Sequence, residues 1–176
     1  MLALASISYA QKLPSSIRGY KVYRTDIRVG TSGDKRATVE VGEPRIVDVG
    51  LSGMTLEATA VINGLGQDGQ IDFLMFEDVA VNGIRMDVDE YQHSFDLKKG
   101  RATTLPAPVR GHLSTLNVAK TAYNEATTSR PEWQITGTVF VFGRFKKMGF
   151  AFKRVIPVPI TLVIPNPLKS IAADHR

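Results

Sequence analysis

The sequence predicts a mainly β protein, an antiparallel sandwich or barrel of about eight to ten short strands with one α-helix. Apolar and polar residues alternate with period two through most of residues 20–162, which is the pattern of half-buried strands. Turn-forming residues separate these alternating runs at short intervals. Apolar residues recur at three- and four-residue spacing in one stretch, residues 113–126, which indicates a helix.

Residues 20–41 are predicted to form a hairpin-like unit. Alternating apolar residues mark strands at 20–27 and 37–41. The sequence Ser-Gly-Asp at 32–34 supplies turn chemistry between the two strands. Pro44 then interrupts the pattern before the next extended stretch.

The middle of the chain predicts two further strands separated by a loop. Residues 55–62 alternate strictly, which is typical of a half-buried antiparallel strand. Its apolar face consists of Leu56, Ala58, Ala60 and Ile62. Residues 63–69 contain three glycines and predict a loop. The next strand is expected to carry one apolar face made of Ile71, Phe73 and Met75.

Local turn signals divide the following region. Asn82-Gly83 between two alternating runs is a strong hairpin signature, because a type I′ turn needs positive φ at both central residues. Lys98-Lys99-Gly100 is expected to end another strand. Two prolines place residues 103–109 at a sheet edge or a bulge, since proline cannot donate a ladder hydrogen bond.

The last third predicts the helix and two or three strands. The apolar face of the helix is expected to consist of Leu113, Leu116, Ala119, Ala122 and Tyr123. Residues 133–141 alternate and predict a strand in which Trp133 is a core residue. We expect a loop at 143–149 and a hairpin partner strand that begins near Phe150 and Phe152. A last strand is expected to point Val158, Ile160, Leu162 and Ile164 to one side.

Length and composition fit one folded domain with appendages. The chain has 176 residues, of which 43% are hydrophobic, and 22% are charged, so it can build a packed core without disulfides or a structural metal. The absence of cysteine excludes a disulfide framework, cysteine-based zinc sites, iron–sulfur clusters and thiol catalysis.

The two ends of the chain are not assigned to the predicted sandwich. The apolar residues 1–10 end in Ser8-Tyr9-Ala10, whose small residues resemble a signal-peptidase site, although no positive charge precedes them. The segment is therefore either the remnant of an export signal, which would make the protein secreted or periplasmic, or an ordinary N-terminal arm of a cytoplasmic protein. Residues 166–176 are expected to form a C-terminal tail, and no apolar run is long enough for a spanning helix.

Several motifs in order resemble a known family. They are the segment Pro44-Arg-Ile-Val-Asp-Val-Gly-Leu that leads into an alternating strand, the Asn-Gly hairpin at 79–84, the Leu-Pro-Ala-Pro-Val end of residues 95–109, the strand at 133–141 and the closing strand at 155–160. Together they resemble the late embryogenesis abundant group 2 domain, also called the WHy (water stress and hypersensitive response) domain. The resemblance implies a Greek-key β-sandwich of the fibronectin III or immunoglobulin type over residues 44–165, with residues 1–43 as an N-terminal extension. It also implies a role in stress or desiccation tolerance.

Charge is separated along the chain. Residues 68–97 contain eight acidic residues and one arginine, a balance of −7. Clustered carboxylates can bind Ca²⁺, but the acids lack the ligand spacing of an EF-hand loop, so we expect solvated acids and no metal site.

The opposite charge gathers near the predicted C-terminal hairpin. Five cationic residues are interleaved with phenylalanines, and they form the candidate site for an anionic partner: Arg144, Lys146, Lys147, Lys153 and Arg154. Such a segment can meet an anionic membrane surface or another acidic partner. Nucleic acid is disfavoured, because in a strand the phenylalanines should point inward and the charges outward. Phe145, in the expected loop, is the exception.

Catalytic constellations are missing from the sequence. His93, His112 and His175 have no ligand-like spacing, and no nucleophile-elbow motif is present. Residues 64–69 spell Gly-x-Gly-x-x-Gly, but a strand and not a helix is expected after them, so we interpret them as a hairpin loop. We therefore expect no catalytic residues and no cofactor.

The sequence favours a non-enzymatic β-sandwich binding or accessory module of the late-embryogenesis type. The alternative is a structural subunit of a larger assembly, with residues 1–43 as a docking arm. In that case the acidic and basic segments of neighbouring copies would attract one another. A protein partner or self-association is the expected mode of action in both.

Overall fold

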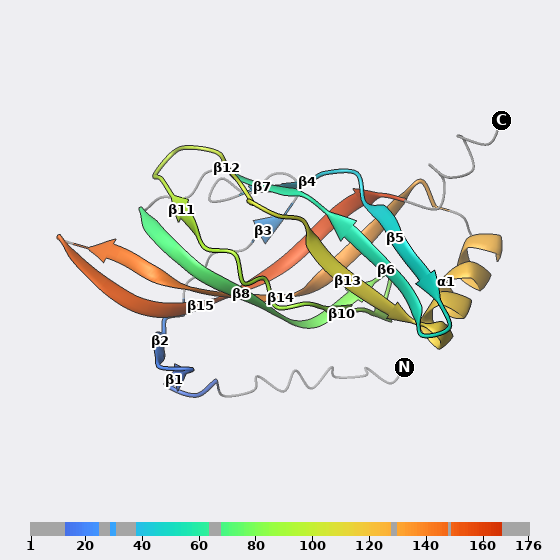
Figure 1. Cartoon of the computed structure of the whole chain (residues 1–176), viewed down its shortest axis with the longest axis horizontal. Coiled ribbons are helices and arrows are strands. Elements are labelled where there is room, and N and C mark those ends of the chain that lie inside the picture. The colour runs from blue at the N-terminus through green and yellow to red at the C-terminus, as the bar shows by residue number, and fades with distance from the viewer. Residues whose placement is uncertain are drawn as a thin grey trace, which may run out of the picture.

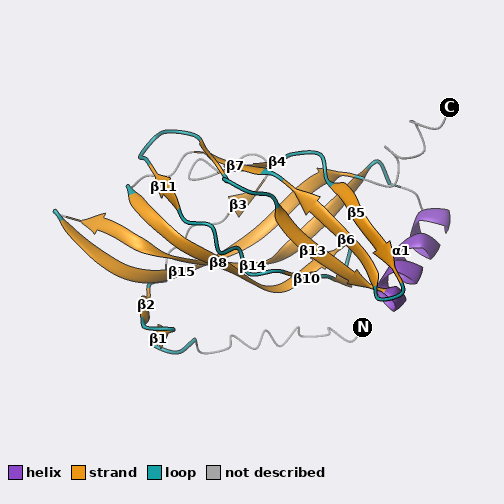
Figure 2. Ribbon diagram, in the orientation of Figure 1, coloured by secondary structure: helices purple, strands orange, loops and turns teal. Residues whose placement is uncertain are grey.

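A computed structural model describes residues 13–24, 29–30, 38–63, 68–127, 130–147 and 149–166. These residues form two facing β-sheets with one helix at one end of the molecule (Figures 1 and 2). This arrangement confirms the predicted mainly β sandwich with a single helix. The structure divides the chain into more and shorter strands than the sequence predicted, except for one hairpin that is much longer.

The large sheet curls around the interior of the sandwich. Its main path runs β11-β8-β14-β15-β3-β4-β7-β12. Its strands are β1 (Ser16–Ile17), β2 (Tyr20–Val22), β3 (Val29–Gly30), β4 (Thr38–Val41), β7 (Ala60–Asn63), β8 (Gly69–Val81), β9 (Ile84–Arg85), β11 (Phe95–Leu97), β12 (Thr103–Thr104), β14 (Glu132–Lys147) and β15 (Phe150–Pro165).

The small sheet lies across the open side of this curl. Its strand order is β10-β13-β6-β5. The strands are β5 (Arg45–Gly50), β6 (Gly53–Ala58), β10 (Asp87–Val88) and β13 (Val109–Ser114). The helix α1 (Thr115–Thr127) follows β13 directly and packs against β6, β13 and β9.

The predicted alternating stretch 55–62 belongs to both sheets. β6 ends at Ala58 and pairs with β5 and β13, whereas β7 starts at Ala60 and pairs with β4 and β12. The chain changes sheet at Thr59, yet the expected apolar face stays on the interior side. The predicted alternation is therefore confirmed, but the stretch forms two strands in different sheets instead of one strand.

The N-terminal strands do not form the predicted hairpin-like unit. β2 and β3 each pair in parallel with β15, and β3 pairs in parallel with β4. Strands joined by a tight hairpin would be antiparallel, so that prediction is wrong for the strands, while the expected turn at 32–34 lies outside the described residues. β1–β4 thus belong to the same sheet as the C-terminal strand.

The β14–β15 hairpin is longer than predicted. The two strands pair without a break from Glu132↔Pro165 to Lys147↔Phe150, so the expected loop at 143–149 is wrong. Inside this region Phe145 is buried and packs in the core. An apolar side chain on the interior face keeps the strand extended beyond the point where basic residues suggested a loop.

Two irregularities in β8 change which side chains face the interior. Ile71 pairs with Gly143 whereas Phe73 pairs with Phe142, so Asp72 is an additional residue in β8. A bulge of this kind moves the following side chains to the opposite face. Ile71 therefore packs in one core cluster, and Phe73 and Met75 pack in another. The prediction of one shared face for these three residues is wrong.

The helix begins two residues later than expected. Leu113 belongs to β13 and is fully buried, while Leu116 and Tyr123 are exposed. Val118 packs against the core and Thr121 is buried. The apolar spacing identified the helix correctly and its buried face incorrectly, because Leu113 is a strand residue.

Other local predictions are confirmed. Asn82 and Gly83 have φ values of 50° and 81°, and β9 folds back on β8 through this turn. β12 lies at the end of the sheet path, as the neighbouring prolines required. Trp133 is fully buried in the cluster next to α1.

Candidate functional site

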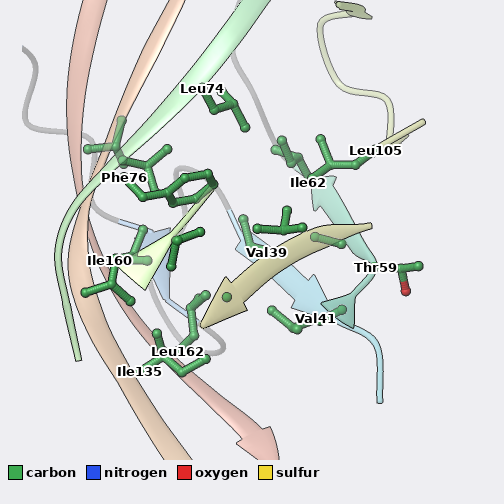
Figure 3. A pocket seen from close by; sticks show the side chains of 18 of the residues that line it. Val39, Val41, Thr59, Ile62, Leu74, Phe76, Leu105, Ile135, Ile160 and Leu162 are labelled. Carbon is green, nitrogen blue, oxygen red and sulfur yellow. The ribbon is translucent and has the colours of Figure 1, made fainter. Parts of the chain in front are cut away.

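A cavity of about 220 Å³ lies between the two sheets. It is partly open to solvent, and its wall is apolar almost throughout. Figure 3 shows side chains of β4, β7, β8, β14 and β15 converging on the same space. The residues of its wall include Val39, Val41, Leu56, Ala58, Ala60, Ile62, Ile71, Leu74, Phe76, Leu97, Leu105, Val109, Ile135, Val139, Val141, Phe145, Val158, Ile160 and Leu162.

The sequence builds this cavity from small and branched residues on interior-facing strand positions. Ala58, Ala60 and Gly111 line it from the strands around the small sheet, and none of them reaches far across the gap. Protein interiors are normally packed with few voids larger than a water molecule. A cavity of this size is therefore a feature that requires an explanation.

The wall contains few polar groups. Glu57 lines the cavity, but its Oε1 atom accepts a hydrogen bond from Nε of the exposed Arg110 at 2.5 Å. Thr59 also lines the wall, and this residue is exposed to solvent. An apolar cavity without convergent polar groups stays dry and favours an apolar occupant.

Tyr91 secures one side of the cavity. It packs with Leu74, Leu97 and Leu105, and its hydroxyl accepts a hydrogen bond from the backbone N–H of Ala107 at 2.9 Å. Burial raises the pKa of Tyr91 above its ordinary value, and the Ala107 hydrogen bond opposes this shift weakly. The phenol therefore stays neutral at physiological pH and acts as a structural group.

The wall of the cavity offers almost only apolar contacts. Among the residues that the structure describes, no histidine, serine or aspartate lines the cavity. Within the described ranges, no group of three or more His, Cys, Asp or Glu side chains is arranged to hold a metal ion. The cavity can therefore exclude water and enclose an apolar group, which is what small-molecule binding sites do.

Four of the five predicted cations are placed on the two faces of the long hairpin, while Lys147 belongs to β14 and its side chain lies outside the described part. Arg144 pairs directly with Lys153, so both project from the outer face, where Arg144 lies 3.5 Å from Asp72. Lys146 follows on that face, and Arg154 lies on the other. Arg154 stacks 4.4 Å from the ring centre of Tyr23 and 5.3 Å from that of Phe152, and Lys153 lies 5.7 Å from that of Tyr20.

The aromatic residues of this hairpin differ from the prediction. Phe150 is 70% exposed and Phe152 is 43% exposed, so the prediction that these phenylalanines point inward is wrong. The two strands extend past the sandwich here, and neither sheet formed by the described residues covers their end (Figure 1). Phe145, expected in a loop, is instead buried in the cavity wall. The structure thus places exposed rings and cations together at the hairpin tip.

The acidic and basic segments meet within one molecule. Glu90 accepts a bidentate pair of hydrogen bonds from Nη1 of Arg18 at 2.9 and 2.8 Å. Asp72 lies beside Arg144 and accepts a hydrogen bond from the hydroxyl of Tyr20 at 2.8 Å. Burial raises the pKa of Tyr20, and the Asp72 hydrogen bond and charge add to that shift. Part of the charge separation is therefore compensated inside the chain.

The remaining sequence candidates have structural roles or lie outside the described residues. His112 contacts Thr55 and the carbonyl of Ser52, and His93 lies beside the ring of Tyr91. A strand follows the Gly-x-Gly-x-x-Gly segment, as expected, although most of the segment lies outside the described residues. The strands that it connects do not pair with each other, since β7 pairs with β4 and β12 and β8 pairs with β11, β14 and β9, so the interpretation as a hairpin loop is wrong. Ser8-Tyr9-Ala10, His175 and the tail from residue 167 onward are also outside them.

Sequence reasoning missed the cavity and a second surface feature next to it. A wide hollow beside the end of β11 collects Lys98, Lys99 and Arg101 with Arg144 and Lys146. The only sequence signal was the run Lys98-Lys99-Gly100-Arg101, which predicted a turn. No helix of the described part has the length and apolar character needed to cross a bilayer.

Comparison with known proteins adds two distant structural neighbours. No protein-family model and no curated protein sequence matches the chain. A crystal structure of a protein from Archaeoglobus fulgidus is similar at a TM-score of 0.38 and 13% identity, covering 72% of this chain and 95% of the other. The solution structure of a candidate late embryogenesis abundant (LEA) protein is similar at a TM-score of 0.33 and 12% identity, covering 74% and 71%. The neighbours thus include a candidate LEA protein, while membership of that family stays a prediction.

Proposed function

We propose that this protein is a non-enzymatic binding module that encloses the apolar part of a small ligand between its two sheets. The observation that carries the proposal is the apolar cavity of about 220 Å³. The long β14–β15 hairpin and the curled path through β4 and β7 hold the sheets apart around it. A binding role accounts for a space that a purely structural sandwich would fill with side chains.

The size of the cavity defines what fits. An engineered cavity of about 150 Å³ lined by similar side chains holds a six-carbon benzene ring, so 220 Å³ accommodates about nine carbon atoms in proportion. Burying a CH₂ group contributes about 0.8 kcal/mol, which gives about 7 kcal/mol for nine of them. That sum corresponds to a Kd of about 10 μM and is an upper limit on affinity, because binding also orders the chain of the ligand.

Calorimetric titration with 1-decanol tests this function. The wild-type protein is expected to bind one decanol with a negative heat-capacity change, which marks apolar burial. Val139→Phe places a ring inside the cavity, since Val139 lines it between Val158 and Phe76, and should abolish binding. The matched control is Val163→Phe on the exposed side of β15, which should bind like wild type. Equal binding by wild type and Val139→Phe would contradict the proposal.

A second candidate function is docking on an anionic membrane surface through the tip of the β14–β15 hairpin. The specific observation is the juxtaposition of the exposed Phe150 and Phe152 with Arg154, whose guanidinium lies 5.3 Å from the ring centre of Phe152. Aromatic rings favour the membrane interface, and nearby cations are attracted to anionic lipids.

Vesicle co-sedimentation tests this second function. Binding to vesicles that contain phosphatidylserine is expected, and it should fall in about 0.5 M salt because such salt screens exposed charges beyond a few Å. Phe150→Ser should weaken it, whereas Leu116→Ser, at an exposed position on α1, should not. Salt-insensitive binding, or the same loss in both variants, would remove this function.

The stress-protective role and the structural-subunit alternative stay predictions. Either would be exercised through surface contacts with a partner or a second copy. Light scattering over a wide concentration range addresses the subunit alternative, since a monomer at every concentration contradicts self-assembly. The described part of the proposed docking arm, β1–β4, is hydrogen-bonded within its own chain.

A further inference from the structure

The basic hollow next to the cavity narrows the class of ligand. The hollow is defined by the cationic side chains of Lys98, Lys99, Arg101, Arg144 and Lys146. It lies at the end of β11 and beside the ends of β8 and β14, at the opposite end of the molecule from α1 (Figure 1). Its volume of about 800 Å³ is large enough to leave a charged group solvated.

The hollow is positively charged and largely unneutralised. Two carboxylates, those of Asp68 and Asp96, accompany the five cations, which leaves a balance of +3. Oδ1 of Asp68 accepts the backbone N–H of Lys99 at 2.7 Å, so this carboxylate also fixes the turn. Arg144 is close to Asp72, while the other four cations form no ion pair with any acid in the described part of the chain.

The turn that carries three of the cations is firmly built. Gly100 adopts φ 69°, and the N–H of Arg101 donates to the carbonyl of Lys98 at 3.1 Å. The carbonyl of Asp68 accepts the N–H of Lys146 at 3.3 Å. Asp68 therefore ties the turn at 98–101 to β14 and holds both halves of the hollow in place.

Leu97 connects the hollow with the cavity. It is buried and lines both of them. Its register partner Gly69 has no side chain, and a Cβ there would lie 2.9 Å from the ring of Phe145 on the cavity side. Arg144 and Lys146 line the hollow from the outer face of the sheet, whereas Leu97 and Phe145 face the cavity. The hollow therefore adjoins the cavity at the end of β11, where the turn at 98–101 follows Leu97.

We propose that the ligand is a single-chain amphiphile with an anionic head group. The alkyl chain lies in the cavity, and the head group lies in the basic hollow past Leu97. This inference rests on the proposed function and names its ligand class. A lipid with two long chains is excluded by the cavity volume, and a cationic amphiphile is excluded by the charge of the hollow.

Calorimetry with ten-carbon probes that differ only in the head group tests the inference. Sodium decanoate and decyl phosphate should each bind about ten-fold more tightly than 1-decanol at low salt, and decyltrimethylammonium should bind more weakly than decanol. The preference should shrink at high salt, since exposed charges are screened. Tighter binding of decyl phosphate would assign the head to a phosphate, and tighter binding of decanoate to a carboxylate.

Charge variants locate the effect. The triple variant Lys98→Gln, Lys99→Gln, Arg101→Gln should lose the preference for the anion and keep the affinity for decanol. A control that removes three cations elsewhere, Arg85→Gln, Lys120→Gln, Arg130→Gln, should keep the preference, because these exposed residues are absent from the hollow.

The outcomes separate the two proposals. Equal affinity for decanoate and decanol, or an equal loss of preference in both triple variants, would overturn the anionic head group and leave the apolar cavity function standing. Absence of binding by decanol, decanoate and decyl phosphate alike would overturn both.

Discussion

Tyr91 links the core to the irregular segment that follows β11. Its ring packs against residues of the cavity wall, and its hydroxyl accepts the N–H of Ala107 between two prolines that cannot donate. Tyr91→Phe should lower the free energy of unfolding by about 1–2 kcal/mol, because the buried N–H of Ala107 loses its partner. Urea unfolding at pH 7 measures this difference, and an unchanged midpoint would contradict the role assigned to the hydroxyl.

The same substitution has a defined pH dependence. The pKa of Tyr91 is raised in the folded protein by burial, so the folded state keeps its proton at pH values where the unfolded chain loses it. The stabilisation is complete below the ordinary tyrosine pKa of about 10 and is lost as pH rises toward the folded-state pKa. The stability gap between wild type and Tyr91→Phe should therefore narrow above about pH 10. A gap that widens there would show that the pKa shift has the opposite sign.

Two glycines in turns differ in what a side chain would meet. Gly53 has φ 135°, and a Cβ there would collide with the carbonyl oxygen of Leu113, whereas Gly83 has φ 81° with open space around it. Gly83→Ala should cost about 1 kcal/mol for the left-handed conformation alone. Gly53→Ala should cost about 3 kcal/mol or more, since β6 must also move away from β13. Thermal unfolding of both variants checks the order, and equal losses would contradict it.

At the level of elements, the sequence predicts a strand correctly where apolar and polar residues alternate and one face of the strand is buried. It predicts residues 55–62 and 133–141 correctly, because every second side chain there faces the cavity. It fails at β8, where Asp72 is an additional residue and Asp78 adopts φ 51°. A bulge reverses the alternation through pairing with β14, and that partner lies roughly 60 to 70 residues away in sequence. The two-residue period of the sequence alone cannot reveal a bulge of this kind.

The ring of Tyr20 anchors the short N-terminal strands in an aromatic cluster. The ring of Tyr20 makes edge contacts with Phe73 and Phe142, whose rings stack on each other. Tyr20→Ala should detach β1 and β2 locally, so the Tyr23 amide, which donates to the carbonyl of Val155, should exchange its hydrogen much faster. The Leu74 amide in β8 should exchange as in wild type. Unchanged protection at Tyr23 would contradict this anchoring role.

At the scale of the whole molecule, the candidate site depends on distances that the sequence does not contain. The sequence identifies most of the interior-facing residues, including Ala58, Ala60 and Val139, but not the gap that remains between them. A gap forms when two sheets are held apart by larger side chains at both ends, here Phe145 at one end and Trp133 at the other. The basic hollow likewise needs β11 and β14 to be neighbours of β8. Both features are products of the tertiary arrangement.

The cavity itself predicts a response to pressure that does not depend on any ligand. Unfolding under pressure is driven by the elimination of internal voids, so the volume change of unfolding scales with their size. The volume change of unfolding is on the order of tens of mL/mol. Val139→Phe occupies part of the 220 Å³ cavity, so it should reduce the magnitude of this volume change and raise the midpoint pressure of unfolding. Trp133, the only tryptophan and fully buried, reports unfolding by fluorescence. The exposed control Val163→Phe should unfold with the volume change of wild type. If Val139→Phe and wild type have equal volume changes, the space between the sheets is not empty in solution, and the argument for a ligand cavity loses its basis.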